Sequence, residues 1–377
     1  MVRKQLTCPG GGIGRHARFR FLCSQGCASS SLVPGTIRRI KALRDFRGAF
    51  FLMYNWRGWT MTTERYSLLT TRELAAKCGT STGELEKRFQ PDELVRLNAA
   101  TNGITPQGVR RFLADAGVSY RFRVIANTTM RGGIGKTTST ISTAVRAAQY
   151  GFRTCVLDLD PQGSSSLALG AVPDDDDPIF YDIWQRPEEQ LADALVELSS
   201  HLSILPSSLE NALLDASLLN PGSQKKAVKG VCDQLRILGF DTVIIDCPPS
   251  LGIAVISAIC AAQTIVVPVG SDAFSLKGLD LTLGEIHSIC DTFGLPHPAV
   301  SIIYTRYDQR ETVSRNALTR IRERHPTLPL SVIRTSSEFS KVLAAGETIF
   351  SRYAKNSARE DYDRHVSELL EIALESE

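Results

Sequence analysis

Short apolar runs alternate with longer amphipathic stretches from residue 121 to the end of the chain. Runs such as 243–245 and 264–267 are almost entirely aliphatic, whereas 278–293 has the periodicity of an amphipathic helix. A strand that is apolar on both sides is typical of a parallel sheet covered by helices on both faces. We therefore predict an α/β fold with a mostly parallel sheet flanked by helices, and strands at residues 122–127, 154–158, 202–205, 242–246, 263–268, 300–304 and about 330–333.

Residues 61–120 show a different pattern, in which short helical periods are separated by turn residues. Thr71 is the predicted N-cap of a helix from Arg72 to Cys78, because its hydroxyl can accept a hydrogen bond from a free backbone N–H. Further helices are predicted from Thr82 to about Phe89 and from Pro106 onward. Two helices joined by a glycine-containing turn are typical of a helix-turn-helix, so we predict a small all-α domain here.

Two roles agree with this predicted helix pair. In a DNA-binding helix-turn-helix, polar residues of the second helix face the groove or its phosphates. Here these residues are Ser81, Thr82, Lys87 and Arg88. The alternative is an ordinary helical pair or a dimerisation module, which the same pattern also describes. We predict DNA binding through Lys87 and Arg88, and the alternative stays open at this point.

Residues 1–60 lack the pattern of a folded domain. They hold 11 lysines and arginines against one acidic residue, Asp45, and their first half is rich in glycine, arginine and serine without a period. Three interpretations agree with this composition: a targeting peptide, a basic DNA-binding arm, or non-coding sequence read in frame before a true start at Met61. The abrupt change of composition at Met61 favours the last one. We therefore predict three segments: an unstructured or non-native 1–60, a helical 61–120 and an α/β domain over 121–377.

Charge and cysteine content change this picture only locally. The net charge of +3 combines +10 in residues 1–60, +1 in residues 61–120 and −8 in the remainder. DNA binding by the remainder therefore needs a local basic patch. The nine cysteines show no metal-ligand spacing and predict reduced thiols in a cytoplasm. Four adjacent aspartates at 174–177 predict a solvated loop, and no apolar run reaches the roughly 18 residues of a transmembrane helix.

The clearest chemical signal is a glycine-rich stretch between a predicted strand and a predicted helix. It comprises Gly132, Gly133, Ile134, Gly135, Lys136, Thr137 and Thr138. Glycines let backbone N–H groups turn towards phosphate oxygens, and the helix N-terminus adds a favourable dipole. A lysine at this position can reach the β- and γ-phosphates, and the Thr137 hydroxyl can bind Mg²⁺. The stretch predicts a P-loop for ATP and Mg²⁺, although Met130 stands where the usual first glycine would be.

Carboxylates follow three other predicted strands in a regular order. Asp158 and Asp160 follow the second strand, Asp246 ends the fourth, and Asp308 follows the sixth. Open α/β sheets bind their ligands at the carboxyl ends of strands, where a carboxylate can orient water or hold Mg²⁺. An aspartate at a strand end is often only a cap, so each signal is weak alone. Together they predict Asp160, Asp246 and Thr137 as Mg²⁺ ligands, with Asp308 at the nucleotide.

Six stretches in this order resemble the ParA family of partition ATPases, within the deviant Walker A class of P-loop proteins. They are RGGIGKTT, VLDLDPQGSSS, LPSSLENALL, VIIDCPPSLG, VVPVGSDAFSLKGL and TRYDQR. The resemblance implies an ATP-dependent homodimer, sequence-independent DNA binding by that dimer, and hydrolysis stimulated by a ParB-type adaptor protein. It implies a cytoplasmic, nucleoid-associated protein. The N-terminal helices resemble the extension of larger plasmid-type members, which also repress their own operon.

The resemblance also implies roles for individual residues. Asp160 matches the family's water-orienting aspartate, and Asp246 matches its Walker B acid. Arg131 stands at the signature lysine that reaches across the dimer to the partner's phosphates, and it keeps the charge with a bulkier, planar group. A DNA-binding patch is expected after the last predicted strand, at Arg334, Lys341, Arg352, Lys355 and Arg359, with Arg315 and Arg320 as a second choice.

Three other functions compete with partition. An iron–sulfur reductase component needs cluster-ligating cysteines near a dimer axis, whereas the five cysteines from Cys155 to Cys290 lie mostly within or beside predicted strands and helices. A MinD-like protein needs a basic amphipathic C-terminal helix, but residues 366–377 contain no Lys or Arg, so we predict no membrane binding. A nucleotide-switched DNA-binding transcriptional regulator without a partition role remains the alternative, because the N-terminal helices suit it equally well.

Overall fold

The computed structural model describes residues 68–345, 347–351 and 356–374. Its central element is an eight-stranded sheet in the order β11-β10-β9-β4-β8-β5-β7-β6. The strands are β4 (Arg123–Asn127), β5 (Thr154–Asp158), β6 (Val196–Ser199), β7 (Leu202–Leu205), β8 (Thr242–Asp246), β9 (Thr264–Val269), β10 (Ala299–Tyr307) and β11 (Leu330–Arg334). All neighbouring pairs are parallel except β6 and β7. The predicted parallel sheet is confirmed, and the short edge strand β6 was not foreseen.

Side chains alternate along each strand between two apolar cores, one on each face of the sheet. On β4, for example, Val124 and Ala126 belong to one core and Ile125 belongs to the other. The first core is covered by α7 (Phe180–Ile183), α8 (Pro187–Ala194), α9 (Leu214–Ser217), α10 (Pro221–Ile237), α11 (Ile253–Ala261), α12 (Ala273–Phe293) and α13 (Thr312–Arg324). Within the described ranges, no helix is long and apolar enough to cross a bilayer.

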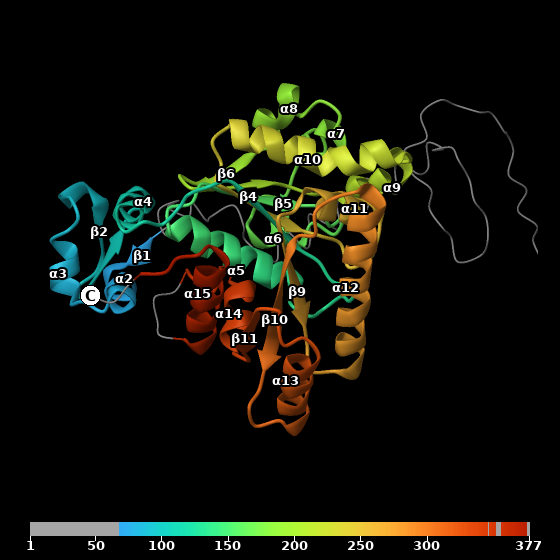
Figure 1. Ribbon diagram of the computed structural model, residues 1–377. Coiled ribbons are helices and arrows are strands. Elements are labelled where there is room, and N and C mark those ends of the chain that lie inside the picture. The colour runs from blue at the N-terminus through green and yellow to red at the C-terminus, as the bar shows by residue number, and fades with distance from the viewer. Residues whose placement is uncertain (1–67, 346, 352–355, 375–377) are drawn as a thin grey trace, which may run out of the picture. The chain divides into compact units, whose positions relative to one another are not determined.

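Two helices form the main cover of the second face. They are α5 (Lys136–Gln149) and α15 (Ser357–Leu369), which lie side by side (Figure 1). Both contribute buried side chains to the second core, and α5 is buried along nearly its whole length. The shorter helices α6 (Ser164–Ala168) and α14 (Glu338–Ala344) also pack on this core, whereas the 3₁₀ turn η4 (Leu209–Leu213) contacts α7 and α9 on the first face.

The N-terminal segment forms a small module that we define as residues 68–118. Its elements are β1 (Leu69–Thr70), α2 (Thr71–Cys78), α3 (Thr82–Glu86), η3 (Pro91–Glu93), β2 (Leu94–Asn98), β3 (Thr101–Ile104) and α4 (Pro106–Asp115). The three helices occur where the sequence predicts them, but the prediction of an all-α domain omits an antiparallel sheet in the order β1-β3-β2. These strands contain two to five residues with polar positions and a glycine, so they show no clear alternation.

Two local details of the module also differ from the predictions. Thr70 is the N-cap of α2, and Thr71 is its first helical residue. The Thr70 hydroxyl accepts from the Glu73 backbone N–H, while the Glu73 carboxylate accepts from Thr70, which completes a capping box. Helix α3 ends at Glu86, so Lys87 and Arg88 lie in the following turn rather than on the helix.

The N-terminal module packs directly on the second face of the sheet. Its Leu74 and Phe112 belong to the same apolar core as Ala144 and Ala148 of α5. Arg110 donates to the Gly151 carbonyl at 2.9 Å and to both carboxylate oxygens of Asp241. The domain boundaries of the sequence analysis stay predictions, but this shared core means that the module is anchored rather than tethered by a linker.

Close packing of α4 on the end of α5 generates a stability prediction. Gly151 has a φ of +81°, and an added Cβ would lie 2.6 Å from the Arg110 Cβ and from the Pro106 carbonyl oxygen. Gly117 has a φ of +89° with nothing within 4 Å of its Cβ position. We expect Gly151→Ala to lower the free energy of unfolding by about 3 kcal/mol and Gly117→Ala by about 1 kcal/mol.

Urea unfolding of the two glycine variants measures this difference. Both glycines follow a helix and both have a left-handed backbone, so Gly117→Ala controls for backbone strain alone. Equal losses of stability in the two variants would contradict close packing of the module on α5.

Candidate nucleotide-binding site

The glycine-rich loop connects β4 to α5 in the middle of the sheet, where β4 lies between β8 and β9. Gly133 and Gly135 have φ values of +77° and +87°, a backbone conformation that other residues rarely adopt. An added Cβ on Gly133 would meet nothing within 4 Å, so the space above the loop is open. Thr305 lies at the irregular end of β10. Its hydroxyl donates to the Ile134 carbonyl at 2.7 Å and so connects the loop backbone to β10.

Lys136 is the first residue of α5 and points into a group of carboxylates. Its Nζ lies 2.8 Å from Asp246 Oδ1 and 3.8 Å from Asp160 Oδ2, and the lysine side chain is only 7% exposed. Burial alone would lower the pKa of Lys136, but the charge and hydrogen bond of Asp246 raise it above its usual value. The ammonium group is therefore charged and available to a polyanion at the loop. The structure thus brings together Lys136, Asp160 and Asp246, which the sequence assigned to an ATP and Mg²⁺ site.

Asp158 has a different environment from its neighbour Asp160. It is fully buried, and its Oδ2 accepts from the Ser166 backbone N–H at 2.9 Å and from the Ser166 hydroxyl at 2.8 Å. Burial, with the nearby charge of Asp246, raises the pKa of Asp158 to about 7. Asp160 is less deeply buried and accepts from the Gln162 backbone N–H. The two acids of this segment are thus unequal, which the sequence did not distinguish.

Several supporting hydroxyls were not singled out by the sequence reasoning. Ser165 donates to Asp246 Oδ2 at 2.8 Å, and Ser207 donates to the Asp160 carbonyl at 2.8 Å. Asn211 in turn donates to the Ser207 hydroxyl at 2.7 Å. These residues belong to the stretches VLDLDPQGSSS and LPSSLENALL. Polar residues directly after a predicted strand were the signal in the sequence by which they could have been found. They hold the backbone and carboxylates of the site in place.

The residues of the loop suit a nucleotide with Mg²⁺. Mg²⁺ usually keeps several waters and takes one or two protein oxygens with substrate phosphates rather than a full protein cage. Thr137 is the second residue of α5, after Lys136, and Asp246 ends the adjacent strand β8, so they would supply such oxygens. Among the described residues there is no group of three or more His, Cys, Asp or Glu that could hold a metal ion by themselves.

Arg131, directly before the loop glycines, and Asp308, directly after β10, each form an ion pair. Arg131 pairs with Asp272. Asp308 pairs with Arg310 at 2.6 Å, and the Arg310 hydrogen bonds lower the pKa of Asp308 to about 2. In this region Thr305 is the residue that bonds the loop directly. Nucleotide contact by Asp308 and cross-dimer contact by Arg131 stay predictions.

The predicted DNA-binding residues have unequal surroundings. Arg334 forms a bidentate pair with the buried Asp361, and Lys341 is exposed beside Glu338. Arg352 and Lys355 lie outside the described residues. Arg359 is 5% exposed and donates to Glu73 and to the Phe350 carbonyl, so its inclusion in a surface patch was wrong. Lys87 and Arg88 of the module are exposed.

This geometry defines a P-loop nucleotide-binding protein, and known proteins agree. A family model described as an AAA domain matches residues 122–295. The chromosome partitioning protein ParA of Myxococcus xanthus is 28% identical over 204 residues, which are 53% of this chain and 70% of that protein. A crystal structure of cobyrinic acid a,c-diamide synthase from Mycobacterium smegmatis, with a bound ATP analog and magnesium, is 29% identical with a TM-score of 0.55 and covers 66% of this chain and 94% of that one.

A further relative matches a longer part of the chain. The cell division protein PomZ of Myxococcus xanthus is 24% identical over 308 residues, which are 80% of this chain and 92% of that protein. Residues 119–377 make up less than 80% of the chain, so the match to PomZ includes part of the N-terminal module. In motif order and in site geometry, the chain is therefore similar to ParA-type ATPases over its α/β part.

Removing the buried lysine tests the site directly. Lys136→Ala should weaken binding of a fluorescent ATP analogue by about two orders of magnitude or more, because charge-assisted hydrogen bonds to two phosphates are removed. Equilibrium titration followed by fluorescence anisotropy measures this affinity. Lys229→Ala, which removes an exposed lysine of α10 paired with Asp233, is the control. An unchanged affinity in a folded Lys136→Ala protein would refute the assignment of the loop.

Proposed function

We propose that this chain is a partition-type ATPase that binds ATP with Mg²⁺ at the P-loop, dimerises on ATP and hydrolyses it under stimulation by a ParB-type adaptor. The observation that carries the proposal is the buried Lys136 between Asp246 and Asp160, at the carboxyl ends of neighbouring strands. This arrangement supplies a phosphate-binding cation, an Mg²⁺ ligand and a water-orienting carboxylate within one site. The ParA and PomZ relatives support the family, and the adaptor is proposed from that likeness.

Binding to DNA without sequence preference is the second part of the proposal. The relevant charges are the exposed cations on the helices after the last two strands of the sheet. Arg320 of α13 is exposed and lines a groove of about 590 Å³ with Lys277 of α12, while Lys341 is exposed on α14. Arg334 contributes less freely, because Asp361 already opposes its charge. We further propose that Lys87 and Arg88 of the module contact operator DNA and that the protein represses its own operon on the nucleoid.

The catalytic role of Asp160 gives a specific expectation. Asp160→Ala should bind ATP as wild type does, hydrolyse it at least about 100-fold more slowly and remain dimeric with ATP, because the carboxylate acts on water rather than on nucleotide. Phosphate release and size-exclusion chromatography with ATP measure both properties. Asp176→Ala, in the exposed acidic loop, is the control. Hydrolysis at the wild-type rate in Asp160→Ala would contradict the role.

The DNA proposal predicts a change in salt dependence. Arg320→Glu combined with Lys341→Glu should weaken ATP-dependent binding to random-sequence DNA and lower the salt slope by about two units, about one for each phosphate that is no longer neutralised. Gel shifts over a salt series measure the slope, with ATP affinity as the check on the active site. The matched double variant Arg186→Glu with Lys229→Glu reverses two exposed cations outside this surface and should bind as wild type. Equal slopes in both double variants would exclude this DNA surface.

A further inference from the structure

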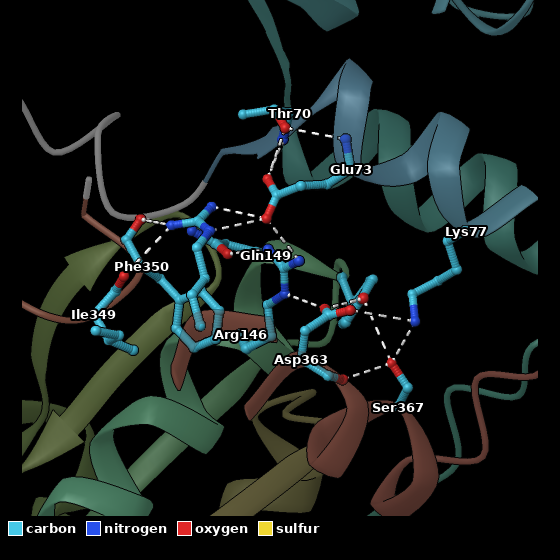
Figure 2. Close-up of polar contacts among 11 residues, drawn as sticks. Thr70, Glu73, Lys77, Arg146, Gln149, Ile349, Phe350, Asp363 and Ser367 are labelled. Carbon is cyan, nitrogen blue, oxygen red and sulfur yellow. Dashed lines mark hydrogen bonds and ion pairs between the residues drawn. The ribbon is translucent and has the colours of Figure 1, made fainter. Parts of the chain in front are cut away.

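A network of buried and half-buried charges connects the N-terminal module to α5 and α15 (Figure 2). We call it the junction network and define it as Glu73 and Lys77 of α2, Arg146 and Tyr150 at the end of α5, and Arg359, Asp363 and Ser367 of α15. Bonded members are separated by up to 290 residues in sequence, as in the bond from Lys77 Nζ to Ser367 Oγ at 2.6 Å. The network therefore forms only when all three helices are in place.

Glu73 has two tasks, one on each carboxylate oxygen. Its Oε2 accepts from the Thr70 hydroxyl at 2.7 Å and closes the cap of α2. Its Oε1 accepts from Arg146 at 2.9 Å and from Arg359 at 3.0 Å. Burial alone would raise the pKa of Glu73, but the charges of Arg146 and Arg359 lower it to about 2. One carboxylate therefore joins the start of α2 to guanidinium groups of both α5 and α15.

Arg146 joins the two halves of the network. Its side chain is 1% exposed, and each of its three nitrogens has a partner: Nε donates to Asp363 at 2.6 Å, Nη1 to Gln149 at 2.8 Å and Nη2 to Glu73 at 2.9 Å. Asp363 also accepts from the Tyr150 hydroxyl at 2.5 Å and pairs with Lys77 at 3.5 Å. The module thus contacts α5 and α15 through both Glu73 and Lys77.

The same two helices are linked again beside the nucleotide site. Ser139, one turn into α5 from Lys136, bonds the Tyr362 hydroxyl at 2.9 Å, and both side chains are buried. Tyr362 immediately precedes Asp363 on α15. Hydrogen bonds and ion pairs therefore link the first turn of α5 to α15, and α15 to α2. Phosphate in the loop must compete with Asp246 for the Lys136 ammonium, so nucleotide binding changes the contacts at the start of this series.

We propose that Glu73 is a positioning residue for the nucleotide site. Glu73 lies outside the P-loop fold, and it acts on the site by holding α2, α5 and α15 together through the junction network. Nucleotide binding at the loop then alters the exposure of α2 backbone groups, and removal of the Glu73 charge alters nucleotide affinity by the same coupling. Such reciprocity is a thermodynamic requirement for coupled sites. This inference rests on the ATP binding of the proposed function and uses neither its DNA nor its adaptor part.

Hydrogen exchange on the full chain tests the coupling. In wild type, a non-hydrolysable ATP analogue with Mg²⁺ should slow amide exchange in the P-loop and also in peptides that cover Thr71–Cys78. In Glu73→Gln, the response of α2 should disappear, and the Kd for the analogue should rise about fivefold or more, the lower end of typical coupling between sites. Glutamine also serves in a capping box, so this variant removes the charge and keeps the cap of α2.

The chain contains a matched control for this variant. Glu84 occupies the same position in the capping box of α3, bonds Ser81 and Thr80, and is exposed. Glu84→Gln should keep both the α2 response and the analogue affinity of wild type. A wild-type protein whose P-loop is protected by the analogue while α2 is unaffected would overturn the coupling and leave ATP binding intact. Wild-type affinity and α2 protection in Glu73→Gln would overturn it as well.

A second variant keeps the proposal testable if Glu73→Gln does not fold. Lys77→Met removes the bonds to Asp363 and Ser367 and leaves the Glu73–Arg146 pair in place. Its side chain is partly exposed, so methionine can occupy the same space at the module surface. We expect a smaller α2 response to the analogue than in wild type. A full wild-type response in Lys77→Met would contradict transmission through the Asp363 branch.

Discussion

Helix α5 carries a buried cation at each end, and the need to pair both cations constrains its surroundings. Lys136 at the N-terminal end is 7% exposed and meets Asp246 and Asp160, whereas Arg146 in the last turn is 1% exposed and meets Glu73 and Asp363. A buried charge is strongly unfavourable unless ion pairs and hydrogen bonds compensate its missing hydration. Helix α5 therefore requires acidic residues from β8, α2 and α15 and from the segment after β5. Through these ion pairs the same helix contacts both the nucleotide site and the N-terminal module.

The two ends of α5 differ in what their ion pairs can do. Replacing a fully satisfied buried ion pair by apolar residues is often neutral or stabilising. The Arg146 contacts are therefore weak evidence for a gain in stability, but strong evidence that they fix the position of the C-terminal end of α5. All three nitrogens of Arg146 have fixed partners, and its guanidinium also lies over the Tyr150 and Phe350 rings. Lys136 is a flexible point charge with an open loop beside it. The helix thus has one fixed end and one that can change partners.

Local patterns in the sequence predicted the sheet and the loop, because aliphatic runs and glycines act on their immediate neighbours. The order of strand-end acids then located Asp160 and Asp246 near Lys136. The junction network was not predictable in this way, since Arg146 and Asp363 each look like one charge on an amphipathic helix and meet only after the chain folds. For the same reason Arg359 was assigned to the surface, although it pairs with Glu73 in the interior. The short polar strands of the module lacked any periodic signal.

Charge balance at the open end of α5 explains the unequal acids of the site. Asp160 and Asp246 lie beside Lys136, and the buried Asp158 lies close to Asp246, where a polyanion has to be accepted. Burial and the nearby charge of Asp246 raise the pKa of Asp158 to about 7, well above that of an ordinary carboxyl. The Ser166 hydroxyl can donate to the charged form and accept from the neutral one, so the geometry survives either state. Protonation of Asp158 would reduce its repulsion against Asp246.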